Sequence, residues 1–279
     1  MTKKVLVIIL NYLTYKLTID LIEDLNNLNV DLFDILVIDN NSPNESASIL
    51  ERESKRNNFV FIGNKINNGY AAGNNIGLRY AYTHNYKYSL ILNNDVKIND
   101  KNIIELLISD LENNKKIGAV GPRIVDLEGN AIAPYVNRPN IWNMTLGISR
   151  DKKVRNSNIY ISRYVYRLFG CCLLVNNAVM NQIDYFDERT FLYQEENILA
   201  EKMRNIGYKM YYDSEVSIIH MESSTINSSG FGKNTKKRKI LEDSTKIYLK
   251  NYRGYNNLYL YLCIYTRNLI NIIKEGMRK

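Results

Sequence analysis

The sequence predicts an α/β fold, in which a mostly parallel central sheet carries helices on both of its faces. Short apolar runs alternate with segments of helical periodicity over the first 125 residues. This alternation is typical of βαβ units, whose parallel strands are joined by right-handed crossovers. Two of the apolar runs lead into an aspartate, at the edge of the sheet where open α/β folds bind their ligands.

The elements of the first half follow from these patterns in chain order. Continuous apolar runs of strand length predict strands over residues 5–10, 35–38, 59–62, 88–92 and 118–125. Apolar residues at helical spacing, or polar segments with a favourable start, predict helices between them over residues 17–28, 44–57, 71–82 and 101–112.

The pattern loosens between residues 126 and 164, where Pro134, Pro139 and the single tryptophan, Trp142, lie. We expect an irregular excursion over the ligand-binding edge there. The elements predicted beyond it are a strand over residues 169–175, a helix over 195–206, a strand over 216–219 and helices from residue 235 on.

The composition indicates a globular protein rather than a disordered one, because 45% of the 279 residues are hydrophobic and 24% are charged. The formal net charge is +8, and much of the excess lies in residues 233–253, whose only acidic residues are Glu242 and Asp243. Such a region suits an anionic membrane surface, a phosphorylated substrate or a nucleic acid, and does not choose among them.

Cysteine usage and the lack of long apolar stretches predict a cytoplasmic protein. Cys171, Cys172 and Cys263 form no framework of spaced pairs, which favours a reducing compartment. The first apolar run is interrupted at Asn11 and no small-residue cleavage site follows, so no signal peptide is expected. No uninterrupted apolar stretch reaches the roughly 18 residues that a membrane-spanning helix needs.

Two aspartates stand at predicted strand ends. Asp39 follows the second strand, and it either caps the turn that comes next or accepts a hydrogen bond from the N3–H of a uracil or thymine ring. Asp95 follows the fourth strand through Asn93 and Asn94. It is either structural or a ligand of Mg²⁺ or Mn²⁺, which prefer oxygen ligands.

A glycine-rich segment, residues 68–77, lies between the third strand and the third helix. Small residues let a backbone approach a ligand, and the N-terminus of a helix can face a phosphate. The segment matches neither the GxxxxGK[ST] phosphate loop nor the GxGxxG fingerprint. On spacing alone, its glycines therefore favour helix packing.

Glu195 and Glu196 begin the helix predicted over residues 195–206. Acidic residues in a first helical turn are favoured by the macrodipole, and the same position keeps a carboxylate ionised for use as a general base. His220 follows the last predicted strand. A neutral imidazole there either satisfies a local hydrogen bond or binds a metal or a phosphate.

The order of these segments resembles one enzyme family, the family 2 glycosyltransferases. The matching segments are IDNNS at 38–42, NGYAAGNNIG at 68–77, LNND at 92–95, FLYQEE at 191–196 and the strand that ends at His220. The resemblance runs from about residue 5 to residue 224, and looks closest to bacterial rhamnosyl-, galactosyl- and glucosyltransferases of surface polysaccharides. It departs from the commoner motifs at Glu196, where an aspartate is usual, and at Asn93, where a second carboxylate is frequent.

The resemblance implies a GT-A fold and an inverting transfer of a sugar from a UDP- or dTDP-sugar to a glycan hydroxyl, in the biosynthesis of a capsule or cell-wall polysaccharide. It implies that Glu196, or Glu195 in its place, is the catalytic base, and that Asp95 and His220 hold Mg²⁺ or Mn²⁺. The residues that it implies for binding the nucleotide-sugar are Asn11, Asp39, Asn41, Asn68, Gly69, Gly73, Asn74, Asn93 and Asn94.

The resemblance also divides the chain. It implies a catalytic domain over residues 1–228, with a nucleotide-binding half up to about residue 125, an acceptor half over 126–228, and a basic, aromatic-rich helical region over 229–279. That last region either lies on the inner face of the cell membrane, beside a lipid-diphosphate-linked acceptor, or packs as helices on the catalytic domain or across a homodimer.

Two other functions remain open on the sequence alone. A sugar-phosphate nucleotidyltransferase also uses an α/β sheet with acidic metal ligands, but no Arg/Lys-rich loop follows Leu10. A nucleic-acid-binding protein would fit the charge of +8 and the 22 tyrosines, but its basic residues should be interleaved with aromatic ones on one face. The charge lies away from the tyrosines of the core, so we expect no nucleic-acid partner.

Overall fold

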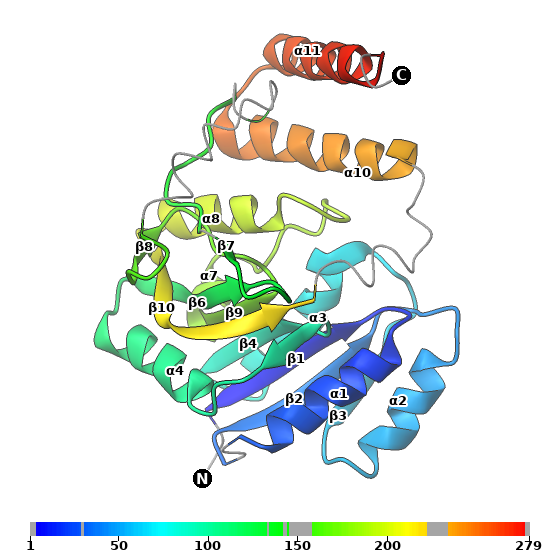
Figure 1. Cartoon of the computed structure of the whole chain (residues 1–279), viewed down its shortest axis with the longest axis vertical. Helices are drawn as coiled ribbons and strands as arrows, with labels where there is room; N and C mark the ends of the chain where they lie inside the picture. Colours follow the sequence, from blue (N-terminus) through cyan, green and yellow to red (C-terminus); the bar gives the residue numbers. More distant parts are fainter. Residues whose placement is uncertain are drawn as a thin grey trace.

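The computed structural model describes residues 4–28, 31–132, 134–141, 144, 158–221 and 234–276. Within these ranges the strands form one ten-stranded sheet, helices cover both of its faces, and the helices α10 (Asn234–Ile247) and α11 (Asn257–Gly276) form a further layer at one end (Figure 1). The predicted α/β architecture with a helical C-terminal appendage is confirmed.

Strands and helices alternate in the first part of the chain, as predicted. These elements are β1 (Val5–Asn11), α1 (Tyr15–Asn26), β2 (Phe33–Asp39), α2 (Ser46–Ser54), β3 (Val60–Gly63), α3 (Gly69–Thr83) and β4 (Tyr88–Asn93). The strands lie in the order β3-β2-β1-β4, and each neighbouring pair is parallel.

The second part of the sheet mixes strand directions. Its elements are β5 (Val96–Ile98), α4 (Ile103–Asn113), β6 (Ile117–Val125), β7 (Ala131–Ile132), β8 (Arg163–Val165), β9 (Cys172–Asn176), α7 (Asn177–Gln182), α8 (Glu195–Asn205) and β10 (Lys209–His220). β9 lies antiparallel between β4 and β6, and β10 runs parallel to β6 and antiparallel to β5. The predicted parallel arrangement therefore holds for β1 to β4 and for the β6–β10 pair, but not for β9. The amino-acid sequence of a buried apolar strand does not show whether the strand runs parallel or antiparallel to its neighbours.

Several elements differ in extent from their predictions. The strand predicted over residues 169–175 begins only at Cys172, and the one predicted over 216–219 is the end of the much longer β10. The first half of β10 mixes polar and apolar residues, so no continuous apolar run marks it. The predicted domain boundary at residue 228, Trp142 and much of the excursion lie outside the described residues.

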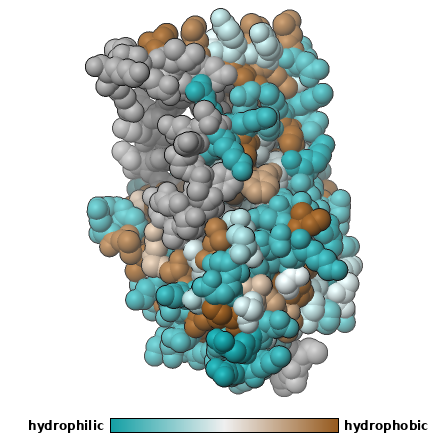
Figure 2. Space-filling model, turned by 90° about the vertical axis from the view of Figure 1, so that its right-hand side faces the viewer, coloured by the Kyte–Doolittle hydropathy of each residue, from teal (hydrophilic) through white to brown (hydrophobic). Residues whose placement is uncertain are grey.

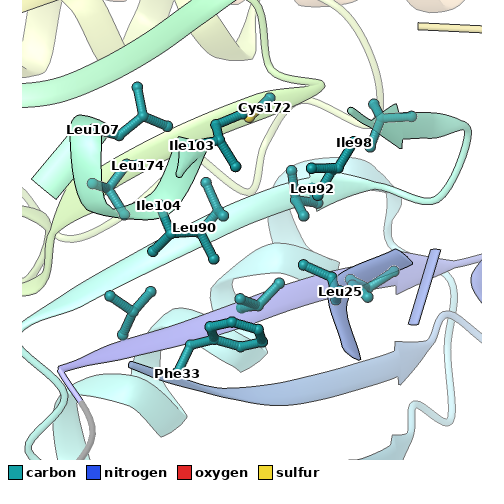
Figure 3. Close-up of a cluster of buried hydrophobic side chains, with 14 of the residues drawn as sticks. Leu25, Phe33, Leu90, Leu92, Ile98, Ile103, Ile104, Leu107, Cys172 and Leu174 are labelled. Carbon is teal, nitrogen blue, oxygen red and sulfur yellow. The ribbon is translucent and has the colours of Figure 1, made fainter. Parts of the chain in front are cut away.

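The side chains of β1 alternate between two cores, one on each face of the sheet. Val5, Val7 and Ile9 pack in one core with α1, α2 and α4, whereas Leu6 and Ile8 pack in the other with α3, α7 and α8. Figure 3 shows part of the first core, where side chains of β4 and β9 lie beside those of α4. Burial on both faces explains why this strand is continuously apolar.

The C-terminal layer packs on α8. It consists of α10 (Asn234–Ile247), the π-helical turn η1 (Tyr248–Tyr252) and α11 (Asn257–Gly276). Tyr248 and Leu249 are fully buried in a third core, which also contains Ile198 of α8 and Leu260 of α11. Among the helices of the described ranges, none combines the length and the apolar character that crossing a bilayer requires.

Candidate active site

The carboxyl ends of β1, β2 and β4 bring the predicted site residues to one edge of the sheet. Asn11 pairs in register with Asp39, and Asn93 follows on the other side of β1. His220, the last residue of β10, pairs with the residue directly after Asp95. The topology therefore brings the predicted nucleotide-binding and metal-binding residues to neighbouring strand ends.

Asp39 is held by the turn that it begins. Its Oδ1 accepts hydrogen bonds from Asn11 Nδ2 and from the hydroxyl of Ser42, both at 2.7 Å, and its Oδ2 accepts the backbone N–H of Ser42 at 2.8 Å. Asn41 adopts a φ of 59° in this turn, which asparagine tolerates better than most residues. Asp39 is only 1% exposed. The turn-capping role is therefore present, and binding of a pyrimidine stays a prediction.

Asn94 ties β4 to β1 and α1. Its amide nitrogen lies 2.8 Å from the hydroxyl of Thr14, 2.9 Å from that of Thr18 and 3.2 Å from Oδ1 of Asn11. The residue is buried. Its side chain thus holds the strand ends together, which makes it a support of the site in addition to any contact with a nucleotide.

Asp95 and His220 face each other without forming a hydrogen bond. Oδ1 of Asp95 lies 3.2 Å from Nε2 of His220, yet both atoms are buried and neither has a hydrogen-bond partner among the residues that the structure describes. A carboxylate oxygen and an imidazole nitrogen that converge in this way fit a divalent cation. The described ranges hold no group of three or more such side chains, so water and substrate oxygens would complete the coordination, as is usual for Mg²⁺.

The glycines of segment 68–77 permit close packing of α3. Gly69 has a φ of +94°, and a Cβ placed on it would overlap the carbonyl oxygen of Phe191. A Cβ on Gly73 would lie only 2.6 Å from Cδ1 of Leu10 on β1. The packing role that spacing favoured is therefore present, and it also brings the start of α3 against the loop that precedes α8.

The asparagines of this segment have different surroundings. Asn68 is exposed at the start of α3, and its side chain makes no capping bond. Asn74 is buried, donates to the carbonyl of Tyr70 at 3.0 Å and leaves its Oδ1 without a partner. Asn75, which the sequence analysis did not single out, exchanges two hydrogen bonds of 3.0 Å with the backbone of Phe186. Asn75 therefore fixes the chain that leads to α8.

Glu195 and Glu196 begin α8 directly after two residues in the left-handed region, Tyr193 (φ 75°) and Gln194 (φ 71°). Such strain in non-glycine residues is often found at functional sites. Glu195 is 5% exposed, and its Oε1 has no hydrogen-bond partner in the ranges described above. Burial, together with the nearby charge of Glu196, raises the pKa of Glu195 to about 8. The side chain of Glu196 is more open, at 27% exposed.

Residues 170 and 171 connect the two groups of carboxylates. The backbone N–H of Gly170 donates to Oε1 of Glu196 at 3.3 Å, and the carbonyl of Cys171 accepts the N–H of Asn93 at 2.9 Å. Burial raises the pKa of the Cys171 thiol, and the nearby charges of Asp95 and Glu196 contribute to the rise. The predicted metal ligands and the predicted base therefore lie near the same short segment.

Arg167, beside Glu196, carried no signal in the sequence. Nη1 of Arg167 lies 4.0 Å from Oε2 of Glu196, and Cζ of Arg167 lies 3.5 Å from the centroid of the Tyr135 ring. The hydroxyl of Tyr70 donates to the carbonyl of Gly170 at 2.7 Å. Arg167 belongs to no periodic pattern and to no motif, so only the fold reveals it, whereas Tyr70 and Gly170 lie in segments that the sequence marks without indicating these contacts.

Comparison with known proteins found a matching family profile and curated relatives. Residues 5–171 match the profile of Glycosyl transferase family 2. The chain is 27% identical over 202 residues to the low-salt glycan biosynthesis hexosyltransferase Agl10 of Haloferax volcanii. This alignment covers 71% of this chain and 63% of that protein. It is 26% identical over 131 residues to the N-acetylglucosaminyl-diphospho-decaprenol L-rhamnosyltransferase of Mycobacterium tuberculosis, in an alignment that covers 42% of this chain and 41% of that protein. The chain thus spans less than two thirds of the length of either curated relative.

The fold is shared with solved glycosyltransferases. The mannosyltransferase PcManGT from Pyrobaculum calidifontis, solved in complex with GDP-Man and Mn²⁺, matches this structure with a TM-score of 0.62 at 13% identity. The match covers 98% of this chain and 75% of that one. A likeness at this identity concerns the fold, and it confirms the predicted GT-A architecture. Since the family profile extends over more than half of the sequence, the chain belongs to glycosyl transferase family 2.

Proposed function

We propose that this protein is an inverting glycosyltransferase that moves a sugar from a UDP- or dTDP-sugar to a hydroxyl of a glycan acceptor, in the biosynthesis of a surface polysaccharide. The observation that carries the proposal is that Glu196 and Asn93, which stands two residues before Asp95, both hydrogen-bond to the backbone of residues 170–171. One carboxylate stands with His220 where a cation fits, and the other stands at a helix start where a proton can be taken. Membership of the family supports sugar transfer as the reaction.

The proposed reaction is a single displacement. Glu196 takes the proton of the acceptor hydroxyl, and the hydroxyl oxygen attacks the anomeric carbon from the face opposite the diphosphate. The bond between the anomeric carbon and the diphosphate oxygen breaks, and the nucleoside diphosphate leaves with the electron pair. One displacement inverts the anomeric configuration. General-base catalysis of this kind contributes about 10²–10⁴-fold to a rate.

Asp95 and His220 are the residues that would hold Mg²⁺ or Mn²⁺, through the two buried atoms that lack partners. Such a cation offsets the charge that develops on the diphosphate as it leaves. The Mn²⁺ in the mannosyltransferase of P. calidifontis supports a cation in enzymes of this fold.

The nucleotide would lie along the ends of β1 and β2 and the start of α3. We assign the nucleoside to Asn11, Asp39 and Asn41, which meet at one turn. The remaining predicted donor contacts, near the diphosphate and the sugar, are Asn68, Gly69, Gly73, Asn74, Asn93 and Asn94. The GDP-Man in the mannosyltransferase of P. calidifontis makes a guanosine donor the alternative to a pyrimidine one.

A donor screen tests the proposed reaction. The protein is incubated with UDP-, dTDP- and GDP-sugars, with Mn²⁺ or with a chelator, and release of nucleoside diphosphate is measured beside the thermal shift caused by each nucleotide. We expect one nucleotide class to stabilise the protein and to be released in a Mn²⁺-dependent way.

A pair of substitutions makes the screen specific. Glu196→Gln should lower the release about 10²–10⁴-fold while the nucleotide still raises Tm. The matched control is Glu242→Gln on α10, where Glu242 pairs with Lys246 at 2.8 Å and lines the groove towards α11. If no nucleotide stabilises the wild-type protein and none is released, the proposed function is wrong.

We further propose that α11 rests on an anionic membrane surface at the inner face of the cell membrane. One stripe of this helix presents large apolar side chains that are 45–69% exposed, namely Leu258, Leu262, Tyr265, Leu269 and Ile273. Figure 2 shows hydrophobic side chains at the upper end of the molecule, where Figure 1 places α11. The other side of the C-terminal layer packs on α8 through Tyr248, Leu249 and Leu260, as one of the alternatives left by the sequence expects, while this stripe of α11 is left uncovered.

Charge supports a membrane as the occupant of this stripe. Lys237 and Lys239 of α10 and Lys250 of η1 are exposed in the same layer, and basic residues beside an apolar stripe bind anionic headgroups. A groove of about 560 Å³ between α10 and α11 is lined by Lys246, Lys250, Tyr261 and Tyr265 among others. Contact with a membrane would bring the enzyme to a lipid-diphosphate-linked acceptor, which the name of the M. tuberculosis relative also supports.

Vesicle flotation tests the membrane contact. We expect the protein to float with vesicles that contain phosphatidylglycerol and not with phosphatidylcholine alone, and the variant Leu258→Ser/Leu262→Ser/Tyr265→Ser to lose flotation. The control variant Leu127→Ser/Tyr160→Ser/Ile161→Ser removes residues that are 52–72% exposed elsewhere, and should float like the wild type. If nothing floats and sedimentation shows a dimer that the α11 variant lacks, the stripe is a homodimer interface and the membrane proposal is wrong.

A further inference from the structure

Arg167 is a largely buried cation that stacking, rather than a close carboxylate, holds in place. Its side chain is 14% exposed, and its guanidinium stacks on the ring of Tyr135, with Cζ 3.5 Å from that centroid. The ring of Phe169, which contacts that of Tyr135, has its centroid 5.8 Å from the same Cζ. Its backbone N–H donates to the carbonyl of Tyr135 at 3.2 Å. Its Nε is buried and makes no hydrogen bond within the described part of the chain.

A second arginine near the same helix shows what a purely structural pair looks like. Arg138 binds Glu201 of α8 with two hydrogen bonds of 2.6 Å and 2.7 Å, a closed bidentate pair. Arg167 instead stands 4.0 Å from Glu196, close enough to act through its charge but without a direct hydrogen bond. A carboxylate held in this looser way stays available to take a proton.

The charged and titratable groups around Glu196 come from four segments of the chain. Glu195 precedes it on α8, Tyr70 lies on α3, Cys171 lies just before β9, and Arg167 follows β8. The Tyr70 hydroxyl is turned to the carbonyl of Gly170 and not to Glu196. Of these groups, only Arg167 is positively charged.

We infer that Arg167 is a positioning residue for the general base, whose guanidinium 4.0 Å away orients the Glu196 carboxylate and thereby makes Glu196, rather than Glu195, the proton acceptor. The inference rests on the proposed function. An opposite charge at this distance favours the ionised form of a carboxyl, whereas two adjacent carboxylates oppose the ionisation of both. Burial and the charge of Glu196 outweigh the opposing charge of Arg167 at Glu195. Its pKa, raised by burial to about 8, leaves it protonated at neutral pH.

The pH profile of nucleoside diphosphate release tests this role. We expect Arg167→Gln to lower the rate at pH 7 at least about 10-fold and to move the acid limb of the profile up by about 1 pH unit or more. Arg167→Lys, which keeps the charge, should restore most of the position of the limb. The matched control Arg138→Gln should lower Tm but leave the limb where it is.

Two outcomes would overturn the inference. One is an Arg167→Gln profile with the same limb as Arg138→Gln. The other is a loss of nucleotide binding, seen as a lost thermal shift, that accounts for the whole loss of rate, because Arg167 would then be a ligand of the diphosphate. The choice between the glutamates has its own check: Glu195→Gln should keep activity within about 10-fold, and Glu196→Gln should lose about 10²–10⁴-fold.

A spectroscopic readout separates failure of this inference from failure of the proposed function. The carboxyl carbon of Glu195, assigned by its absence in Glu195→Gln, should titrate near pH 8 in ¹³C NMR. The midpoint should rise in Arg167→Gln and fall in Glu196→Gln, whether or not any donor is turned over. An unchanged midpoint in Arg167→Gln would overturn the inference even in an active enzyme.

Discussion

Oδ1 of Asp95 and Nε2 of His220 lie 3.2 Å apart, where β5 turns back beside the end of β10. Leaving two buried polar atoms unpaired costs free energy, so something else must hold them there. The backbone does so: His220 pairs with Val96, and the N–H of Met221 donates to the carbonyl of Asp95 at 2.9 Å. The candidate metal site is thus fixed by the pairing of two strands that are far apart in the sequence.

The Asp95→Asn substitution should remove the response to metal. An amide oxygen carries no charge, so we expect the Mn²⁺-stimulated rate to fall about 100-fold or more, which corresponds to a few kcal/mol of transition-state stabilisation. Titration of nucleoside diphosphate release with Mn²⁺ measures the effect. Asp20→Asn, at an exposed position of α1, is the control. An undiminished Mn²⁺ response in Asp95→Asn would rule out this carboxylate as a ligand.

Gly69→Ala should be far more damaging than Gly129→Ala. Both glycines have positive φ, 94° and 83°, but only a Cβ at Gly69 would overlap another group, the carbonyl of Phe191. Backbone strain alone should cost Gly129→Ala about 1–2 kcal/mol, and we expect more than about 3 kcal/mol for Gly69→Ala. Urea unfolding gives both values, and equal costs would mean that the contact with residue 191 is unimportant.

Glu201→Ala should loosen the C-terminal layer. The buried Glu201 carboxylate accepts hydrogen bonds from Arg138 and from the hydroxyl of Tyr166, and Arg253 lies 3.9 Å away. Removing one member of a buried ionic group typically costs about 3–5 kcal/mol. The exposed-face pair on α10 provides the comparison, since Glu242→Ala should cost no more than about 0.5 kcal/mol. Unfolding in urea measures both variants. Similar losses would show that the network does not anchor this layer.

Asp110→Asn should stabilise the protein above neutral pH. Burial and the neighbouring Asp213 raise the pKa of Asp110 to about 7. The folded state therefore keeps a proton that the unfolded state has lost, and stability falls as pH rises from about 4 to about 7. Asparagine has no such proton to lose, so the variant should gain a few degrees in Tm at pH 8.5, with the gain vanishing towards pH 4. Thermal unfolding between pH 4 and pH 8.5 checks this prediction. A gain in Tm that is independent of pH would contradict the raised pKa of Asp110.

The edge of the sheet was predictable because local sequence marks where a buried strand stops. Asp39, Asp95 and His220 each follow an apolar run, and the structure brings all three to strand ends on the predicted edge. Glu196 was predictable in the same way, as part of an acidic first turn ahead of an amphipathic helix. In each case the information lies within about ten residues of the site residue.

The features that could not be predicted from the sequence depend on contacts between residues that are distant along the chain. The direction of β9 is set by β4 and β6 on its two sides. The role of Asn94 as a tie between strands depends on Thr14 and Thr18. Arg167 acquires a role only because α8 brings Glu196 to it. A pattern read over a short window cannot contain such relationships.

The late entry of β9 affects how the nascent chain can fold on the ribosome. The strand β6 is complete at residue 125, but its neighbours β9 and β10 begin only at residues 172 and 209. At a synthesis rate of about 5–20 residues per second, the first of them arrives about 2–10 s later. During that interval the edges of β4 and β6 remain open to aggregation, so polypeptides that stall shortly after residue 125 should be clients for chaperones.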